Sequence, residues 1–177
     1  LLNQNIHLGF SLVLLLLVIM RDEKNWAKLF WGLGLILSIV VVVFIHLEQE
    51  RLQMWAGFPE VKDIFIGISL VGLIAILTWK NWGSIFLVLI GLSVIYALWG
   101  HHVEGALGHP KFDPKLVLSN LGIGFDGVYG MLLNASANLI FLFIIFGNTF
   151  EAVGIDKFFL EIGTFLGKHL KGGAAQT

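Results

Sequence analysis

The 177-residue chain has no cysteine and little charge. Without cysteine it has no disulfide framework, no thiolate metal site and no cysteine nucleophile. Charged residues make up 13% of the chain, whereas a soluble globular domain usually carries about 25%. This composition excludes a water-soluble enzyme domain and a disordered tail. The net charge of −1, with basic residues scattered along the chain, argues against a nucleic-acid partner.

Sequence motifs of two enzyme classes are also missing. The chain contains no glycine-rich phosphate loop, no zinc-protease helix motif and no nucleophile elbow. ATP hydrolysis and proteolysis are therefore unsupported.

Apolar residues take the place of the missing charge. They make up 57% of the chain, with six tryptophans and fifteen phenylalanines, and the mean hydropathy is +0.87. A helix needs about 20 apolar residues to cross the core of a bilayer. The pattern predicts an all-α polytopic integral membrane protein with about five transmembrane helices, over residues 6–20, 26–47, 64–79, 82–99 and 128–153.

Two of these runs need interpretation. The second contains five consecutive β-branched residues, Ile39 to Val43, which in water would favour a strand. In lipid the backbone must satisfy its own hydrogen bonds, so we interpret the run as a helix. Only Lys80 and Asn81 separate the third run from the fourth, which predicts a tight helical hairpin. The longest hydrophilic connections, residues 48–63 and 100–126, can each hold a short surface helix but no soluble domain.

Two segments are expected to lie along the membrane surface. After Gly154, a candidate left-handed helix cap, apolar residues recur at helical spacing opposite charged ones, which predicts a C-terminal interfacial amphipathic helix. Leu52, Trp55 and Phe58 indicate a weaker counterpart before Pro59. The apolar side of the C-terminal helix holds Ile155, Phe158, Phe159, Ile162, Phe165 and Leu166, and its polar side holds Asp156, Lys157, Glu161, Lys168 and His169.

The distribution of lysine and arginine predicts the orientation, because these residues are enriched on the cytoplasmic side. Residue 1 is then extracytoplasmic and the C-terminal segment cytoplasmic. Tryptophans near the ends of the runs favour interfacial anchoring over an aromatic ligand cage. One side holds Arg21, Lys24, Lys28, Lys80, Lys157, Lys168 and Lys171, and the other holds Arg51, Lys62, Lys111 and Lys115.

The fifth run contains polar residues in otherwise apolar sequence. Polar groups are costly in lipid, so they face other helices or a wet cavity. Both interpretations stay open: hydrogen bonding between helices, or the lining of a transport path. Glycines at 122, 124, 127 and 130 predict a broken or re-entrant entry to this span. The transport-path candidates are Asn134, Ser136, Asn138 and Glu151.

Two polar groups lie in the predicted outer loops. His101, His102 and Glu104, with His109 nearby, are residue types that bind zinc or iron. Adjacent histidines point apart on a helix, however, so we expect a polar loop and no metal site, and a membrane metalloenzyme is only a distant alternative. Glu48 and Arg51 are spaced to form an i, i+3 ion pair. The candidates for docking a soluble partner are Glu48, Glu50, Arg51 and Glu104.

The order and spacing of several motifs resemble the fused permeases of the TRAP (tripartite ATP-independent periplasmic) transporters. The resemblance is strongest from Gly127 onward and covers most of the chain in order. Its motifs are Gly127-Val128-Tyr129-Gly130, the segment 136–147, Phe150-Glu151 with Gly154, Lys157-Phe158-Phe159, Gly167, Gly172-Gly173-Ala174, and upstream Ile6 to Phe10 and Gly57-Phe58-Pro59 with Asp63.

The resemblance implies a secondary active transporter component and not an enzyme. Such permeases use a sodium gradient to import organic acids or related solutes that a periplasmic solute-binding protein delivers, in the cytoplasmic membrane of bacteria or archaea. Residues 1–113 would be the small-subunit-like transmembrane scaffold, and residues 114–177 the incomplete start of the large transport subunit. The chain would have no cofactor of its own, and the sodium ligands would lie in the remainder of the permease chain.

Two expectations concern the extent of the chain and its main alternative. We expect further chain before Leu1 and after Thr177, because the sequence starts without an initiator methionine and ends without a structural stop. The alternative from a different functional class is a stand-alone structural small membrane subunit, with no transport activity of its own.

Overall fold

The structure is a computed structural model that describes residues 1–54 and 57–167. Within these ranges every regular element is a helix, and five stretches are long and apolar enough to cross a membrane. The predicted all-α polytopic architecture is confirmed. The elements are α1 (Leu2–Asp22), α2 (Asn25–Met54), α3 (Val61–Trp82), α4 (Ser84–Trp99), η1 (Gly100–His102), α5 (Pro114–Ile123), α6 (Met131–Ala135), the π-helical turn η2 (Ser136–Ile140), α7 (Phe141–Val153) and α8 (Ile155–Gly167).

Helix α2 is longer than its apolar run. It continues through the charged segment to Met54, because no helix-breaking residue occurs before Gly57 and Pro59. The prediction of a separate surface helix here is wrong for the described residues. Leu52 belongs to α2, Phe58 lies in the irregular segment before α3, and Trp55 lies outside the described residues.

The α3–α4 hairpin turns at a different residue from the one predicted. Lys80 and Asn81 belong to the last turn of α3, where the Asn81 side chain donates to the carbonyl of Leu77 at 2.7 Å. The turn itself is Gly83, which adopts φ 81°. Only glycine takes this conformation without steric cost, and this allows the chain to leave α3 and start α4 within one residue.

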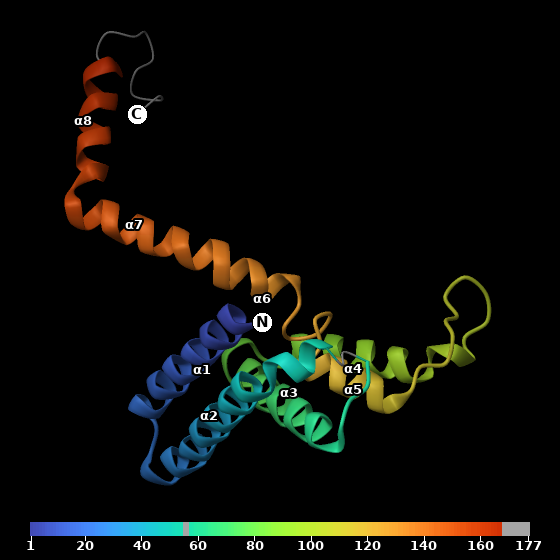
Figure 1. The fold of residues 1–177 in the computed structure, drawn as a ribbon. Coiled ribbons are helices and arrows are strands. Elements are labelled where there is room, and N and C mark those ends of the chain that lie inside the picture. The colour runs from blue at the N-terminus through green and yellow to red at the C-terminus, as the bar shows by residue number, and fades with distance from the viewer. Residues whose placement is uncertain (55–56, 168–177) are drawn as a thin grey trace. The chain divides into compact units, whose positions relative to one another are not determined.

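The chain divides into two compact units, residues 1–135 and 136–177. In the first unit α1 and α2 lie side by side (Figure 1). Leu8, Leu12, Leu16 and Ile19 form the buried stripe of α1 at helical spacing. A Cβ added at Gly9 would lie 2.8 Å from a Val42 methyl, so glycine at this position permits the close packing of the two helices.

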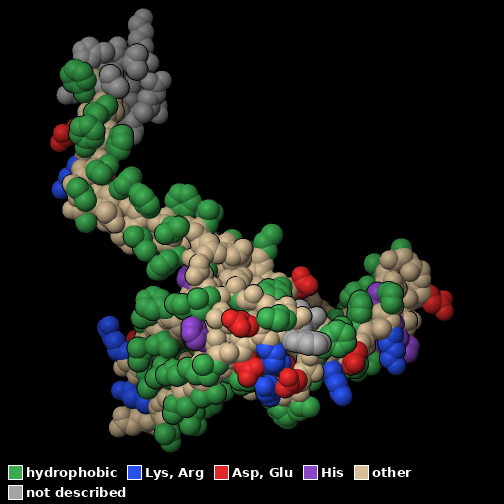
Figure 2. Space-filling model, in the orientation of Figure 1, with side chains coloured by type: hydrophobic (Ala, Val, Ile, Leu, Met, Phe, Trp, Pro, Cys, Tyr) green, Lys and Arg blue, Asp and Glu red, His purple; other side chains and the backbone are tan. Residues whose placement is uncertain are grey.

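The buried core of the first unit is small. It is formed mainly by the facing stripes of α1, α2 and α3, which include Val41, Ile45, Leu70 and Leu73. Only 6% of the apolar window of the Ser84–His102 span is buried within the chain. Many other apolar side chains are exposed, and Figure 2 shows apolar side chains over much of the visible face. Such a surface is compatible with a lipid bilayer as the surrounding solvent.

The α1–α2 turn and the α3–α4 turn lie at the same end of the first unit. The carboxylate of Glu23, between α1 and α2, pairs with Lys80 near the α3–α4 turn. At the other end of the unit, Arg51 near the end of α2 pairs with Asp63 at the start of α3. Helices α1, α2 and α3 are thus antiparallel in order.

Helix α5 lies in the second long hydrophilic connection. Asp113 caps it by accepting from the backbone N–H of Lys115 at 2.9 Å, and Pro114 occupies the first turn. The helix packs on α3 where Gly122 meets Gly67. The first compact unit therefore continues past Asp113. The expected boundary at Asp113 between a small-subunit-like part and the start of the large subunit stays a prediction.

The glycine-rich segment 124–130 interrupts the helical path. The N–H of Val128 donates back to the carbonyl of Leu121 at 3.0 Å, and that of Gly130 donates to Gly127 at 3.0 Å. Helix α6 starts only at Met131. The predicted break before the fifth span is confirmed, and the span begins three residues later than expected.

The second unit consists of η2, α7 and α8. Gly154 separates α7 from α8 with φ 78° and ψ 17°, which confirms the left-handed cap. Helix α8 covers the predicted amphipathic segment from Ile155 to Gly167, with Phe158 and Phe159 exposed on it. Lys168 and His169 lie outside the described residues.

Candidate functional site

A cluster of five charged side chains joins the end of α2 to the start of α3. We call Glu48, Arg51, Glu60, Lys62 and Asp63 the Arg51 cluster. Arg51 Nη1 and Nη2 lie 3.0 and 2.6 Å from the two carboxylate oxygens of Asp63. Arg51 also pairs with Glu48 and lies 3.2 Å from Glu60, while Lys62 lies 3.2 Å from Glu48. The predicted i, i+3 pair of Glu48 and Arg51 is confirmed.

Asp63 has two tasks in this cluster. Its side chain is 2% exposed and accepts hydrogen bonds from both terminal nitrogens of Arg51. One of its oxygens also accepts the backbone N–H of Glu60 at 2.9 Å, as part of a capping box at the start of α3. A buried carboxylate is tolerated when it is paired and hydrogen-bonded in this way. The cluster therefore fastens the α2–α3 connection.

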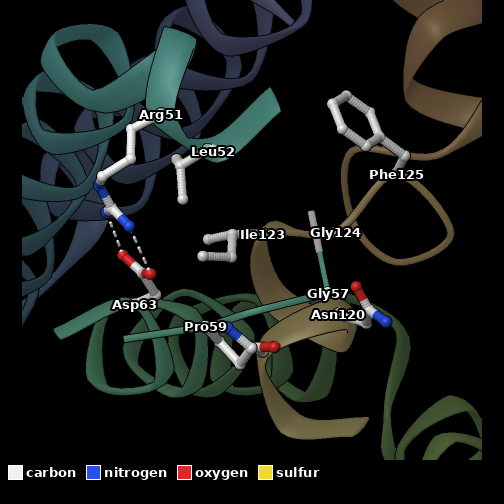
Figure 3. Close-up of a pocket in the computed structure, with 10 residues that line it drawn as sticks. Arg51, Leu52, Gly57, Pro59, Asp63, Asn120, Ile123, Gly124 and Phe125 are labelled. Atoms are coloured by element: carbon white, nitrogen blue, oxygen red, sulfur yellow. Dashed lines mark hydrogen bonds and ion pairs between the residues drawn. The ribbon is translucent and has the colours of Figure 1, made fainter. Parts of the chain in front are cut away.

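A small cavity lies beside the Arg51 cluster (Figure 3). Its volume is about 40 Å³, and Arg51 and Asp63 line it together with Ser119, Asn120 and Ile123 from α5. A water molecule needs roughly 10–15 Å³ of such space, whereas small-molecule sites measure about 300–1,000 Å³. The cavity is large enough for water and too small for an organic solute.

A second polar group is buried among apolar helices, and we call it the Asn5–Tyr129 tether. The Tyr129 hydroxyl donates to Asn5 Oδ1 at 2.8 Å, and Asn5 Nδ2 donates to the carbonyl of Val42 at 2.9 Å. Gln4 Nε2 donates to the carbonyl of Tyr129 at 2.9 Å. Asn5 and Tyr129 are each 1% exposed, and burial raises the pKa of the Tyr129 hydroxyl. The tether joins the start of α1 to α2 and to the segment before α6.

Replacing Tyr129 by phenylalanine is expected to destabilise the fold by about 1–3 kcal/mol, because Asn5 Oδ1 stays buried without a donor. Tyr96→Phe is the matched control, since the Tyr96 hydroxyl donates to the Leu107 carbonyl at an exposed site. Thermal unfolding of both variants in the same detergent measures the difference. Equal losses in the two variants would contradict the role of the tether.

The transport-path candidates occupy consecutive elements of the fifth span. Asn134 lies in α6, Ser136 and Asn138 in η2, and Glu151 in the last turn of α7. Ser136 is half-buried and the other three are exposed. The break between the two compact units coincides with η2, and π-helical turns are frequent at functional sites. Whether these side chains line a path stays a prediction.

The docking candidates fall into two groups. Glu48 and Arg51 are engaged in the Arg51 cluster, and the guanidinium of Arg51 contacts three carboxylates. Glu50 and Glu104 are exposed. The carboxylates of Glu50 and Glu104 are therefore more accessible to a partner than the guanidinium of Arg51.

The histidines of the 100–113 segment do not converge on one point. The ring centroids of His101 and His102 lie 4.0 Å apart, with the ring planes tilted by 39°. His109 Nε2 lies 2.9 Å from the carbonyl of Tyr96, and its Nδ1 lies 2.7 Å from the carbonyl of Pro110. Over residues 1–54 and 57–167, no three His, Asp or Glu side chains are grouped as a metal site requires. The arrangement thus gives the metalloenzyme alternative no ligand set in that range.

His109 is expected to hold the 100–113 segment against α4 in a pH-dependent manner. Both ring nitrogens face carbonyl oxygens, so the doubly protonated ring satisfies both, and these contacts raise the pKa of His109 above its usual 6.5. Its contribution to stability is therefore complete below pH 6.5 and is lost as the pH rises through the higher folded-state pKa.

NMR titration of labelled histidines, with hydrogen exchange of residues 103–113, measures this effect. Exchange should accelerate as His109 loses its proton. In the control His109→Gln the exchange should lose that pH step. A His109 that titrates at or below the usual value would contradict the assignment.

Sequence reasoning missed Gln4, Asn5 and Tyr129 as a group, and it treated Asp63 only as part of a loop motif. Asp63 carried a local signal: an acidic residue three positions after Glu60, at the start of an apolar run, is the spacing of a capping box. The tether had no such signal, because Asn5 and Tyr129 are 124 residues apart.

No family model, curated protein or solved structure matches this chain. The five apolar helices identify it as a multi-pass membrane protein of the all-α class.

Proposed function

We propose that this chain is the N-terminal scaffold portion of a permease of the TRAP type. The permease would import organic acids or related small solutes, driven by a sodium gradient and supplied by a periplasmic solute-binding protein. The motif order from Ile6 to Ala174 supports this proposal. Five membrane-spanning helices are compatible with it.

The observation that carries the proposal is the attachment of residues after Asp113 to the helices before it. Helix α5 packs on α3, and Tyr129 reaches Asn5 and Gln4 at the start of α1. In a fused permease, the small-subunit-like helices would hold the entry to the large transport subunit in place. Buried hydrogen bonds are suited to this task because they specify one arrangement of the helices.

The cavity beside the Arg51 cluster is too small for an organic solute, which is compatible with a scaffold. The cavity beside the Arg51 cluster holds about 40 Å³. In this proposal solute and sodium bind in the remainder of the permease chain. The present residues supply the scaffold and part of the docking face, the surface on which the solute-binding protein docks. Glu50 and Glu104, on the side that the charge distribution predicts to lie outside the cytoplasm, would contact the binding protein.

Transport by the reconstituted full-length protein tests the proposal. Proteoliposomes should take up solute only when an inward sodium gradient and a soluble binding protein are both present. Glu50→Lys with Glu104→Lys should reduce the uptake, because the charge of the docking face is reversed. The exposed Asp22→Lys, at the opposite membrane face, serves as control. Uptake without a sodium gradient or without a binding protein, or no uptake with both, would refute the function.

The second candidate is a stand-alone structural subunit of a membrane complex. The same attachment of α5 and Tyr129 would then serve only to complete a helical scaffold. Co-purification with a separate membrane subunit, with no uptake by the full natural chain alone, would favour this candidate.

A further inference from the structure

Residues of α4 and α5 line a groove between the two helices. The close contact of Gly122 with Gly67 draws α5 onto α3, while α4 follows α3 after the turn at Gly83. Two adjoining cavities of about 400 and 290 Å³ fill the space and share Ala97, Val117 and Leu121. Together they form one continuous groove, which we call the α4–α5 groove.

The polarity of this groove changes along its length. The part beside the middle of α4 is lined by Leu89, Ile90 and Val94, with Ser93, whose hydroxyl donates to the Leu89 carbonyl at 2.9 Å. The part beside the end of α4 contains the polar Asn120 and Asp126. Ala97, which also lines this part, lies two residues before Trp99 in the chain, and tryptophan favours the membrane interface.

Asp126 gives the polar end a negative charge. The residue is exposed, and none of the ion pairs formed within the described ranges includes it. An occupant that matches the groove needs an apolar chain for the middle of the span and a cationic group beside the carboxylate. In a bilayer, a phospholipid with an ammonium headgroup has both features.

We propose that the α4–α5 groove binds a phospholipid of the phosphatidylethanolamine class. One acyl chain lies along Leu89, Ile90 and Val117, and the ammonium group pairs with Asp126. The proposal does not depend on the transport function. Two properties distinguish a bound lipid from the surrounding bilayer. A bound lipid stays with the protein during extraction, and its retention depends on the headgroup.

Native mass spectrometry of the full-length protein tests the proposal. The protein is extracted with mild detergent from vesicles of equal parts dioleoyl-phosphatidylethanolamine and dioleoyl-phosphatidylglycerol. We expect one retained lipid, with the ethanolamine form preferred about two- to fivefold, as for a solvent-exposed ion pair. Asp126→Asn should abolish the preference, and Ala97→Phe, which fills the junction of the two cavities, should abolish retention.

The matched control is Leu92→Phe, because Leu92 lies on α4, is 58% exposed and lines neither cavity. It should retain lipid as the unmodified protein does. Each variant is first checked for an unchanged unfolding temperature, and Asp126→Asn alone decides the proposal if Ala97→Phe does not fold.

Three results would overturn the proposal. One is equal retention of both lipids by the unmodified protein, which describes ordinary surrounding lipid. Another is an unchanged preference in Asp126→Asn. The third is a photo-crosslink from Val117→benzoylphenylalanine to another protein segment and not to lipid, which would identify a protein occupant.

Discussion

Replacing Arg51 by alanine is expected to destabilise the fold by about 3–5 kcal/mol, because the change leaves the carboxylate of Asp63 buried without its partner. The Asp63 side chain is 2% exposed, and two of its hydrogen bonds come from Arg51. The backbone N–H of Glu60 cannot compensate for both. Thermal unfolding in detergent, followed by circular dichroism, measures the loss.

Arg21 provides the matched control for this change. Its side chain is 85% exposed and lies 3.7 Å from Asp22, so Arg21→Ala should change stability by no more than roughly 0.5 kcal/mol. Arg51→Lys should give an intermediate loss, since lysine keeps the charge without the bidentate geometry. The double change Arg51→Leu with Asp63→Leu should recover much of the stability. If Arg51→Ala costs no more than Arg21→Ala, the Arg51 cluster does not hold the α2–α3 connection.

Replacing Gly122 by alanine is expected to cost about 1–3 kcal/mol through overpacking. A Cβ at this position would overlap the Cα and carbonyl oxygen of Gly67 and would lie 2.5 Å from its carbonyl carbon. These are backbone atoms, so relief requires α5 to move away from α3. Because α5 carries Ser119 and Asn120 to the cavity beside the Arg51 cluster, the same shift should alter that cavity.

Gly67→Ala is the control for this contact because the geometry is not symmetric. A Cβ at Gly67 would lie 3.5 Å from the Cα of Gly122, an ordinary van der Waals distance. Alanine also favours a helix interior over glycine by roughly 1 kcal/mol. We expect Gly67→Ala to be neutral or slightly stabilising in the same unfolding measurement. A loss equal to that of Gly122→Ala would mean that the helices do not cross as described.

The membrane-spanning helices could be predicted from sequence because their signal is local. A run of apolar residues that must satisfy its backbone in lipid has one solution, the helix, and even the β-branched run from Ile39 to Val43 lies within α2. Gly154 was recognisable as a cap because it directly follows the last turn of an apolar helix. The pair of Glu48 and Arg51 was predictable because both lie on one helix, one turn apart.

Helix ends were less predictable than the helices themselves. Hydropathy marks where the lipid ends, whereas a helix ends where a residue breaks it. Helix α2 therefore continues past its apolar run to Met54, and α3 continues to Trp82 until Gly83 turns the chain.

The amino-acid sequence by itself determined that the helices are suited to lipid, how many of them can span a membrane, and that charged residues gather at their ends. Only the tertiary structure decided that Tyr129 meets Asn5, that Gly122 meets Gly67, and that Asp63 is the buried partner of Arg51. The reason is physical. Hydropathy and helix caps depend on neighbours within a few turns, whereas the approach of two helices depends on the shapes of residues far apart in the chain, which no local pattern records.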